Sequence, residues 1–302
     1  MAQEYGQWPE SCWISADIDW RAAKKITAGV DIGTASSQAA ILCDGALFGY
    51  ANLRTGANYR QAADKAIQMA LGNSGMAMQD VGAIMRTGWG GDHAVYATGE
   101  TDELTCHAKG ARFLFGPSLH TVVDLGAQTT KAILLYDWDR VRDFMINDKC
   151  ATGMGRNVEF LCDLLQVPIE EIGEKSLDVP EDPEPVSTTC YAFADTETLG
   201  LFGRPEYRSE ALTESEIYAS HMFAIAWRVL GMIGRLQAPD VGDIRITGDL
   251  GFTGGLAKNP GVTRRIEREL GVTALTAAYD PMLAGAIGAA LLAGEGGESH
   301  GL

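Results

Sequence analysis

The sequence predicts an α/β fold in which one structural unit is duplicated to give two lobes. Three observations support this. A segment of the chain recurs after a constant offset, and each copy ends a β-rich run in Asp-x-Gly. A strand, a glycine-rich loop and a helix follow one another later in the chain. The length of 302 residues also suits two ordinary domains, at about 150 residues each.

The repeat relates Val30–Leu42 to Val123–Leu135, so that Asp31 and Asp124 stand 93 positions apart. Each copy continues from Asp-x-Gly through small hydroxylated residues into a second apolar strand. After the first copy, Asp44-Gly45 predicts a two-residue hairpin turn into a third strand. We therefore expect a β-meander rather than a dinucleotide-binding βαβ unit, in which a helix follows the glycine turn directly.

The C-terminal third contains a predicted strand, Asp243–Thr247, then a glycine-rich loop, Gly248–Gly255, then a helix, Pro260–Leu270. Glycines allow a backbone to approach a ligand closely, and a helix N-terminus offers unpaired N–H groups and a partial positive charge. This order of elements is typical of a nucleotide site.

A long helix is predicted from Thr213 to about Leu236, because Thr213 and Glu216 have the spacing of a capping box. Its apolar residues recur with helical periodicity, so we expect them in the core. These residues are Ile217, Phe223, Ala224, Trp227, Leu230 and Ile233.

The last predicted helix, Met282–Ala293, contains Gly285 and Gly288 among alanines. A glycine inside a helix costs about 1 kcal/mol relative to alanine, which suggests that another backbone passes close by. We expect Val179–Pro185, with three prolines and three acidic residues, to be a surface loop, and Val186–Thr189 to be β-rich.

Composition excludes several classes of protein. The formal net charge of −16 argues against binding nucleic acid, because such binding depends on Lys and Arg displacing counterions. No run approaches the ~18–20 apolar residues that span a bilayer, so no membrane association is expected. The N-terminus does not resemble a secretory signal, which favours the cytoplasm. There the six cysteines are expected to be reduced thiols.

The N-terminal residues 1–25 form a predicted extension that contains Trp8, Trp13 and Trp20. Exposed tryptophans are enriched at protein contacts. An arm folded back on its own core is an equally good interpretation.

Three motifs together resemble the first phosphate, second phosphate and adenosine motifs of the actin, sugar-kinase and Hsp70 superfold. They are Gly29–Thr34, Val123–Gln128 and Thr253–Asn259. The resemblance implies a two-lobe ATPase fold. In it, residues 26–118 with the returning helix 282–296 form lobe I, and residues 119–281 form lobe II, the lobe that holds nucleotide and cluster ligands.

Two further motifs, Asn147–Arg156 around Cys150 and Ser187–Ala194 around Cys190, resemble the cysteine motifs of a narrower group. This is the BadF/BadG/BcrA/BcrD-type ATPase family, which includes the activators of 2-hydroxyacyl-CoA dehydratases and the smaller ATPase subunit of ATP-dependent benzoyl-CoA reductase. With the phosphate motifs in the same order, the resemblance covers nearly the whole chain.

The resemblance implies an ATP-hydrolysing subunit that delivers low-potential electrons to separate catalytic subunits. One [4Fe-4S] cluster is shared by two subunits, and Cys150 and Cys190 are its metal ligands in this chain. A cubane cluster ordinarily takes four thiolates, so a paired homologous subunit must complete the set. The expected partners are that subunit, the catalytic reductase subunits, and ferredoxin as electron donor.

The other cysteines are interpreted as structural or incidental. Cys43 and Cys162 lie in apolar patterns that suit core packing. Cys106 and His107 are neighbours in a predicted helix, where side chains do not face one another. Cys12 lies in the extension.

The nucleotide chemistry follows from residue types. Asp31 and Asp124 suit Mg²⁺ held through its waters, because magnesium takes few protein carboxylates. With Gln128 they are the candidate catalytic residues. The candidate cofactor-binding residues supply backbone N–H groups, side-chain donors or close backbone approach to ATP; they are Gly33, Thr34, Ser37, Gly126, Lys131, Gly254, Gly255 and Asn259.

Two departures from the resembled activators favour one half of a heterodimer. A lysine is common where Gln38 stands, and an acidic residue is common where Thr129 stands. The benzoyl-CoA reductase subunit therefore ranks above a homodimeric dehydratase activator. Two rivals remain: an N-acetylglucosamine-kinase-like sugar kinase, with Asp124 as base, and a module that binds ATP without hydrolysing it.

Overall fold

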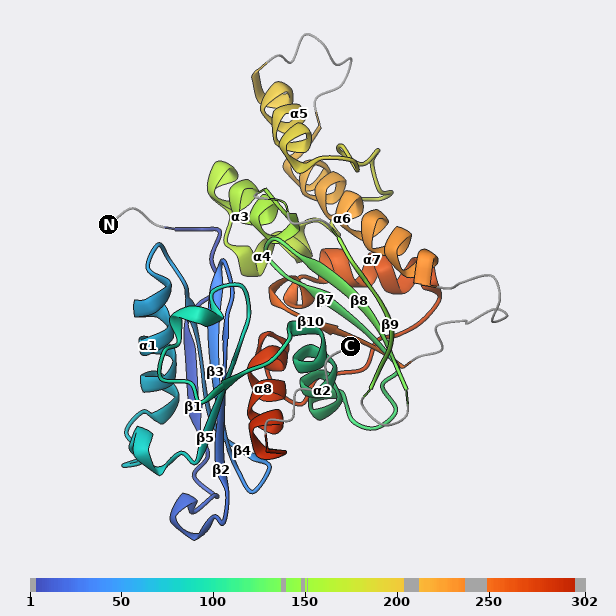
Figure 1. Cartoon of the computed structure of the whole chain (residues 1–302). Coiled ribbons are helices and arrows are strands. Elements are labelled where there is room, and N and C mark those ends of the chain that lie inside the picture. Colours follow the sequence, from blue (N-terminus) through green and yellow to red (C-terminus); the bar gives the residue numbers. More distant parts are fainter. Residues whose placement is uncertain are drawn as a thin grey trace. The chain divides into compact units, whose positions relative to one another are not determined.

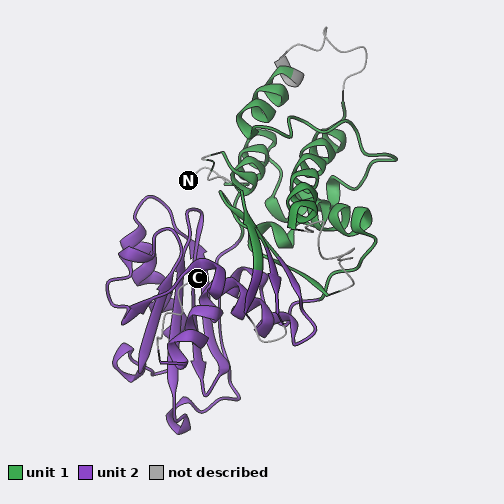
Figure 2. Cartoon of the chain, turned by 45° about the vertical axis from the view of Figure 1, so that its right-hand side comes forward, with its two compact units in different colours: residues 1–8, 123–132, 143–275 green, residues 9–122, 133–142, 276–302 purple. Residues whose placement is uncertain are grey.

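The computed structural model describes residues 4–136, 140–147, 150, 152–203, 212–236 and 249–296, without the side chains of 201–203. The chain divides into two compact units (Figure 2). Unit 1 comprises residues 1–8, 123–132 and 143–275, and unit 2 comprises residues 9–122, 133–142 and 276–302. The predicted strand Asp243–Thr247 lies outside the described residues, as do Asp148, Lys149 and Ala151 beside Cys150.

Unit 2 is built on a six-stranded sheet with the order β1-β4-β3-β2-β5-β6 (Figure 1). Its strands are β1 (Ser11–Ile14), β2 (Ile26–Ile32), β3 (Ser36–Cys43), β4 (Ala46–Arg54), β5 (Ala83–Thr87) and β6 (Gly99–Glu100). Strands β2, β3 and β4 are antiparallel neighbours, which confirms the predicted meander. Asp44 (φ 49°) and Gly45 (φ 84°) form the predicted tight turn.

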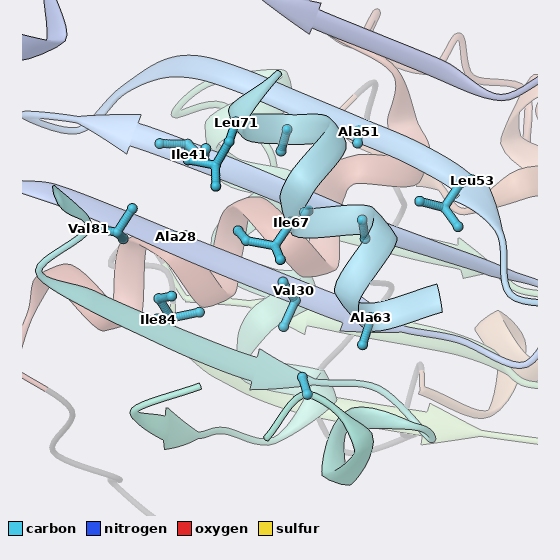
Figure 3. Packing of buried hydrophobic residues seen from close by; sticks show 14 of the residues in the cluster. Ala28, Val30, Ile41, Ala51, Leu53, Ala63, Ile67, Leu71, Val81 and Ile84 are labelled. Carbon is cyan, nitrogen blue, oxygen red and sulfur yellow. The ribbon is translucent and has the colours of Figure 1, made fainter. Parts of the chain in front are cut away.

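Helices cover both faces of this sheet. Helix α1 (Tyr59–Leu71) packs on one face, α8 (Ala284–Gly294) packs on the other, and α2 (Glu103–Phe115) packs on α8. The faces are set by the period-2 alternation of β-strands. The side chains of Val30 and Ile41 point to the face of the sheet that α1 covers, and they belong to the core drawn in Figure 3. The residues that alternate with them along the strands pack toward α8 on the other face.

The glycines of α2 and α8 allow these helices to approach each other closely. A Cβ at Gly288 would lie 1.9 Å from the Cys106 carbonyl oxygen, and one at Gly110 would lie 1.8 Å from that of Ala284. The predicted backbone approach is therefore confirmed at Gly288. At Gly285 the close neighbour is a side chain, that of Asp31.

The second sheet has the order β10-β7-β8-β9. Its strands are β7 (Thr121–Leu125), β8 (Thr130–Leu135), β9 (Val141–Ile146) and β10 (Leu250–Thr253). Strands β7 and β8 hold the second copy of the repeat, and each contributes residues to both units. Short 3₁₀ turns complete the described elements: η1 (Trp20–Ala22), η2 (Met78–Asp80), η3 (Gly91–His93), η6 (Gly255–Lys258) and η7 (Pro281–Leu283).

The described part of unit 1 contains the α-helices α3 (Met154–Leu165), α4 (Ile169–Lys175), α5 (Tyr191–Gly203), α6 (Glu214–Leu236) and α7 (Pro260–Leu270). Helix α6 begins with the predicted capping box. The Glu216 amide donates to Thr213 Oγ1 (3.2 Å), and the Thr213 amide donates to Glu216 Oε2 (2.7 Å). Helix α7 has the predicted bounds, begins at the cap Asn259 and ends at left-handed Gly271.

Two expectations about unit 1 are wrong. Trp227, predicted to be in the core, is 54% exposed, because the buried stripe of α6 runs through the polar His221 instead. Ile217, Ala224 and Ile233 are buried as predicted, whereas Phe223 and Leu230 are only partly buried. The segment Val186–Thr189 is a loop and not a strand.

Helix α6 has close to the predicted bounds and is long and apolar. By length and composition it could cross a membrane, but 67% of its most apolar window is buried inside the protein. That burial is typical of the core helix of a soluble protein.

The N-terminal arm is folded onto the protein. Strand β1 pairs with β4 in unit 2, and Trp13 stacks on Tyr50 with ring centroids 6.0 Å apart. In unit 1, the Tyr5 and Gly6 amides donate to Asp163 Oδ1 on α3. The interpretation of an arm folded on its own core is therefore confirmed for these contacts.

The loop at 179–185 is more than a surface connection. Its Asp182 carboxylate accepts hydrogen bonds from Arg265 Nε (2.8 Å) and Arg268 Nη2 (2.7 Å) on α7. Arg265 is only 1% exposed. Burial alone would raise the Asp182 pKa, but the hydrogen bonds and charges of both arginines lower it overall.

Candidate nucleotide site and cysteine pair

The two copies of the repeat form matching turns. The Gly33 amide donates to the Ser36 carbonyl (3.0 Å), and the Gly126 amide donates to the Thr129 carbonyl (3.1 Å). A Cβ at either glycine would lie 2.7 Å from that carbonyl oxygen, so both turns require glycine. Each turn is partly exposed between buried strands, as a loop that contacts a ligand would be.

Asp31 lies at the end of β2, in a recess made by glycines of unit 2. A Cβ at Gly88 would meet its Oδ1 at 2.3 Å, and one at Gly285 would meet its Oδ2 at 2.0 Å. The carboxylate is 9% exposed, and His107 Nε2 lies 4.0 Å from Oδ2. His107, interpreted from the sequence only as structural, is thus a neighbour of a candidate metal-binding carboxylate.

Thr34 and Ser37 occupy different positions in the first turn. Thr34 is partly exposed in the turn itself. Ser37 is fully buried, and its Oγ lies 2.7 Å from Thr55 Oγ1, which donates to the Gly33 carbonyl (2.8 Å). The buried Ser37 side chain therefore stabilises the turn through Thr55.

Asp124, the second candidate carboxylate, is 2% exposed at the end of β7. Lys131 Nζ donates to its Oδ2 (2.9 Å), and Thr253 Oγ1 donates to its Oδ1 (3.0 Å). Lys131 is itself 4% exposed. Both carboxylate oxygens are therefore held by neighbours within unit 1, and Thr253, the first residue of the predicted adenosine motif, has a role that the sequence did not predict.

The two copies differ in charge at one equivalent position. The offset of 93 residues that relates Asp31 to Asp124 also relates Gln38 to Lys131. Gln38 lies opposite Asp31 in the β2–β3 ladder, but its amide donates to Ser36 Oγ (2.9 Å) and Asn52 Oδ1 (2.8 Å). The cross-strand partner is therefore cationic in the second copy and neutral in the first.

The predicted adenosine motif follows β10. Gly254 (φ 83°) packs against the end of β7, where a Cβ would meet the Leu125 carbonyl oxygen at 2.5 Å and Asp124 Oδ1 at 3.0 Å. Gly255 begins η6. Asn259 is 1% exposed; its Oδ1 caps α7 by accepting from the Val262 amide (3.2 Å), and its Nδ2 has no hydrogen-bond partner among the described residues.

The second phosphate turn packs against the start of α3. The Arg156 amide donates to the Ala127 carbonyl (3.1 Å). A Cβ at Gly153 would lie 2.6 Å from Gln128 Cα, and one at Gly155 would lie 2.7 Å from Ala127 Cα. The two glycines of the first cysteine motif therefore allow a backbone contact that neither position could make with a side chain.

Cys150 and Cys190 each precede a helix and are partly exposed. The Cys150 carbonyl accepts from the Gly153 amide (2.9 Å), and its Sγ lies 3.3 Å from Thr152 Oγ1. The Cys190 carbonyl accepts from the amides of Phe193 and Ala194 in the first turn of α5 (both 3.1 Å). Cys190 therefore directly precedes the first residue of α5, and Cys150 lies four residues before the first residue of α3.

Helix α6 contacts residues before and after Cys190 in the sequence. Arg228 Nε donates to the Thr188 carbonyl, and its guanidinium lies 3.8 Å from the centroid of the Tyr191 ring. Tyr191 is 1% exposed. A cation thus lies next to the segment that carries the second cysteine.

The remaining cysteines have the expected environments. Cys12 is exposed, whereas Cys43, Cys106 and Cys162 are buried. Burial raises the pKa of Cys43 to about 11 and that of Cys162 to about 12, and it raises the pKa of Cys106 further. These three thiols therefore suit packing and not ligation.

Among the described residues, no group of three or more His, Cys, Asp or Glu side chains could hold a metal ion. Within unit 1 the structure brings together Asp124, Lys131, Gly254, the Gly126–Gln128 turn and the helix that follows Cys150. Asp31, Gly33, Thr34 and Ser37 belong to unit 2.

Comparison with curated proteins identifies relatives over most of the chain. The activator of lactoyl-CoA dehydratase from Anaerotignum propionicum is 33% identical over 271 residues, which cover 89% of this chain and 97% of that protein. One of the subunits of benzoyl-CoA reductase from Thauera aromatica is 29% identical, and the match covers 88% of this chain and 92% of that protein.

Solved structures show the same fold. Component A of the Acidaminococcus fermentans (R)-2-hydroxyglutaryl-CoA dehydratase superposes with a TM-score of 0.78 at 30% identity, covering 90% of this chain and 99% of that one. The Clostridium difficile 2-hydroxyisocaproyl-CoA dehydratase activator with bound ADPNP gives 0.76 at 27% identity, covering 92% and 99%. A ROK-family glucokinase from Streptomyces griseus, at 0.51 and 12% identity over 89% and 99%, shares the fold alone.

These similarities confirm the predicted α/β two-lobe fold of actin, sugar-kinase and Hsp70-like ATPases. One protein-family model matches residues 28–293, which include both phosphate motifs, Cys150, Cys190 and the adenosine motif. The chain therefore belongs to the BadF/BadG/BcrA/BcrD ATPase family.

Proposed function

We propose that this chain is an ATP-hydrolysing activator of a 2-hydroxyacyl-CoA dehydratase. It uses nucleotide energy to pass a low-potential electron to a separate catalytic protein. The similarity to the lactoyl-CoA dehydratase activator and to the 2-hydroxyglutaryl-CoA dehydratase component A supports this function over the benzoyl-CoA reductase role that the sequence motifs favoured.

One observation carries the proposal. The Gly126–Gln128 turn, which suits contact with the terminal phosphates of ATP, packs directly on the first residues of α3, just after Cys150. A change in this turn on nucleotide binding or hydrolysis acts on the backbone next to a cluster ligand, because closely packed segments transmit small displacements. Nothing in a sugar kinase requires a thiol at that place.

The nucleotide residues divide into two roles. Asp31, in its glycine recess, holds Mg²⁺ through the waters of the ion, and the Gly33 turn donates backbone N–H groups to phosphate oxygens. Asp124 is fixed by Lys131 and Thr253, so its contribution is to orient the second turn and the water near Gln128. The Gly254 backbone allows close approach of the nucleoside.

The cysteine pair fits half of a cluster site. Cys150 and Cys190 are partly exposed, Cys190 directly precedes α5, and Arg228 adds a positive charge beside the Cys190 segment. Thiolates in such surroundings suit a [4Fe-4S] centre, which supplies one-electron transfer at low potential. Because this chain contributes two ligands, a second subunit supplies the other two, and reduced ferredoxin is the expected donor.

A second candidate is one half of a heterodimeric benzoyl-CoA reductase ATPase. Gln38, which lies opposite Asp31, is neutral, whereas the equivalent residue of the second copy, Lys131, is cationic, and this difference favours an unequal pair of subunits. The similarity to the Thauera aromatica reductase protein adds to it. In that case the chain alone should bind ATP but form no complete cluster.

The two candidates are separated by purifying the full chain alone without oxygen and measuring ATP-dependent activation of a 2-hydroxyacyl-CoA dehydratase component. Activation by the chain alone supports the activator. Activity only with a second ATPase subunit and reductase catalytic subunits would overturn it. Cys150→Ser should abolish activation, and Cys12→Ser, at an exposed thiol far along the chain, is the matched control.

A further inference from the structure

The two cysteine segments are joined through the interior of unit 1 by one buried histidine. His221 on α6 is 1% exposed. Its Nδ1 lies 2.9 Å from Asn157 Oδ1 on α3, and its Nε2 lies 2.6 Å from Thr198 Oγ1 on α5. One imidazole thus bridges the helix that follows Cys150 and the helix that follows Cys190.

Asn157 and Thr198 provide hydrogen-bond partners for both ring nitrogens of His221. Asn157 Nδ2 donates to Asp195 Oδ1 (2.5 Å), which leaves Asn157 Oδ1 to accept from His221 Nδ1–H. The Thr198 hydroxyl has one proton, which goes either to His221 Nε2 or to the Ala194 carbonyl, and the protonation of the ring decides between these two bonds. Asn157 and Thr198 are 1% and 0% exposed, so water cannot replace either partner.

Main-chain hydrogen bonds extend this bridge to both cysteines. On α3, the Asn157 amide donates to the Gly153 carbonyl (2.8 Å), and the Gly153 amide donates to the Cys150 carbonyl (2.9 Å). On α5, Thr198 Oγ1 lies 2.9 Å from the Ala194 carbonyl, and the Ala194 amide donates to the Cys190 carbonyl (3.1 Å). A continuous polar path therefore connects the two cysteines through His221.

Helix α6 also contacts the Cys190 segment through a second residue, Arg228. Arg228 lies seven positions after His221 on α6, which is about two helical turns, so both side chains share a face. Arg228 binds the Thr188 carbonyl and covers Tyr191, the residues on either side of the Cys190 segment. Helix α6 therefore contacts this segment before and after the thiol.

We propose that His221 is a positioning residue that fixes the separation of the Cys150 and Cys190 thiols. This inference rests on the proposed function, in which these thiols bind one cluster. A cubane requires its ligands at set positions, and two cysteines on separate helices keep them only if the helices are held together. The buried bridge through His221 supplies that constraint before any cluster is inserted.

The direct test uses the metal-free full chain and a short bis-alkylating reagent that bridges two nearby thiols. Peptide mass spectrometry of the monomer-sized product measures the Cys150–Cys190 bridge. Thr198→Val, which keeps shape but removes the hydroxyl, should slow bridging about tenfold, the factor that corresponds to ~1.4 kcal/mol. His221→Leu should slow bridging by a similar factor, and Thr198→Ser, which keeps the hydroxyl, should bridge at the wild-type rate.

Tyr218→Phe is the matched control. It removes a hydrogen bond from a buried residue of the same helix, but its partner Glu214 also lies on α6. It should leave bridging unchanged. Equal bridging rates in the wild type, Thr198→Val and His221→Leu, with all three folded by circular dichroism, would overturn the positioning role.

A second readout separates this proposal from the proposed function. In anaerobically loaded protein, Thr198→Val should broaden or shift the electron paramagnetic resonance signal of the reduced cluster, and Thr198→Ser should not. If the wild type holds no cluster, the proposed function fails, and the bridging result still decides whether His221 positions the thiols.

Discussion

At the scale of single residues, the two equivalent aspartates of the repeat have different electrostatic surroundings. Asp124 and Lys131 are a buried ion pair, with side chains 3% and 5% exposed. Removing one partner of such a pair leaves an uncompensated buried charge. Asp31 faces the neutral Gln38 across the ladder and has His107 nearby. The single charge difference between the two copies, Gln38 against Lys131, therefore gives the two aspartates different partners.

The ion pair gives a prediction about stability. Lys131→Gln, which copies the residue of the first repeat, should lower the free energy of unfolding by about 3–5 kcal/mol, because Asp124 stays buried without its cation. Adding Asp124→Asn should recover most of that loss. Urea unfolding of the single and double variants measures both effects, and additive losses would show that the pair is not coupled.

His221 gives a prediction about pH. Burial lowers its pKa from 6.5 to about 4, so the folded state binds its proton less readily than the unfolded chain. Its contribution to stability is present above pH 6.5 and is lost as the pH falls toward 4, in total about 3 kcal/mol.

Two carboxylates with shifted pKa values, Asp195 and Asp182, modify the acidic end of this window. Burial raises the pKa of Asp195, which faces Asn157, so its protonation partly offsets the loss. Asp182 has a lowered pKa and loses its contribution only below its ordinary value of 3.8. Thermal unfolding between pH 7 and pH 4 tests the prediction. The wild type should lose stability as the pH falls, and the stability of His221→Leu should change much less.

At the scale of elements, close backbone contacts explain where glycine is required. The start of α3 touches the second phosphate turn at Gly153 and Gly155, and α2 crosses α8 at Gly110 and Gly288. Each contact leaves no room for a Cβ. The first contact links a predicted nucleotide turn to a cysteine helix, and the second holds the C-terminal helix in unit 2.

Gly153→Ala should weaken nucleotide binding by tenfold or more, about 1.4 kcal/mol, because its Cβ would displace the Gln128 backbone. Gly231→Ala on α6 has no atom within 4 Å of the new Cβ and should bind nucleotide normally, with a stability gain of up to about 1 kcal/mol. Calorimetric titration with a non-hydrolysable ATP analogue compares the two. Equal affinities would contradict the contact's role.

Gly288→Ala should destabilise unit 2 by about 1–3 kcal/mol, the usual cost of overpacking, because α2 and α8 must move apart. Gly91→Ala, where a Cβ meets nothing within 4 Å, is the control and should stay within about 0.5 kcal/mol of the wild type. Chemical denaturation measures the difference. A Gly288→Ala variant as stable as the control would show that the helices can separate freely.

Local patterns predicted many elements correctly, because the signals that start and stop them are local. The Asp44-Gly45 turn, the Thr213 capping box and the bounds of α7 all depend on neighbouring residues. Contacts between distant segments left no such signal. His107 beside Asp31, and Gly153 against Gln128, depend on how strands and helices pack. Trp227 was misplaced because helical periodicity cannot show that a polar histidine occupies the core.

At the scale of the whole molecule, the two phosphate turns belong to different units, and both cysteine segments belong to unit 1. Unit 1 thus contains the nucleotide turn, the helix that follows Cys150 and the histidine bridge to α5. The coupling that we propose between ATP and a cluster needs only contacts inside this unit. In this proposal, a second subunit completes the cluster ligands.

Iron analysis of the chain prepared without oxygen tests the central claim most directly. A cluster shared by two subunits gives about two iron atoms per chain in a dimer, with the spectrum of a [4Fe-4S] centre. Cys150→Ser and Cys190→Ser should each lose it, whereas Cys12→Ser should retain it. A wild-type dimer without iron, or a Cys150→Ser variant with a full iron content, would contradict the account.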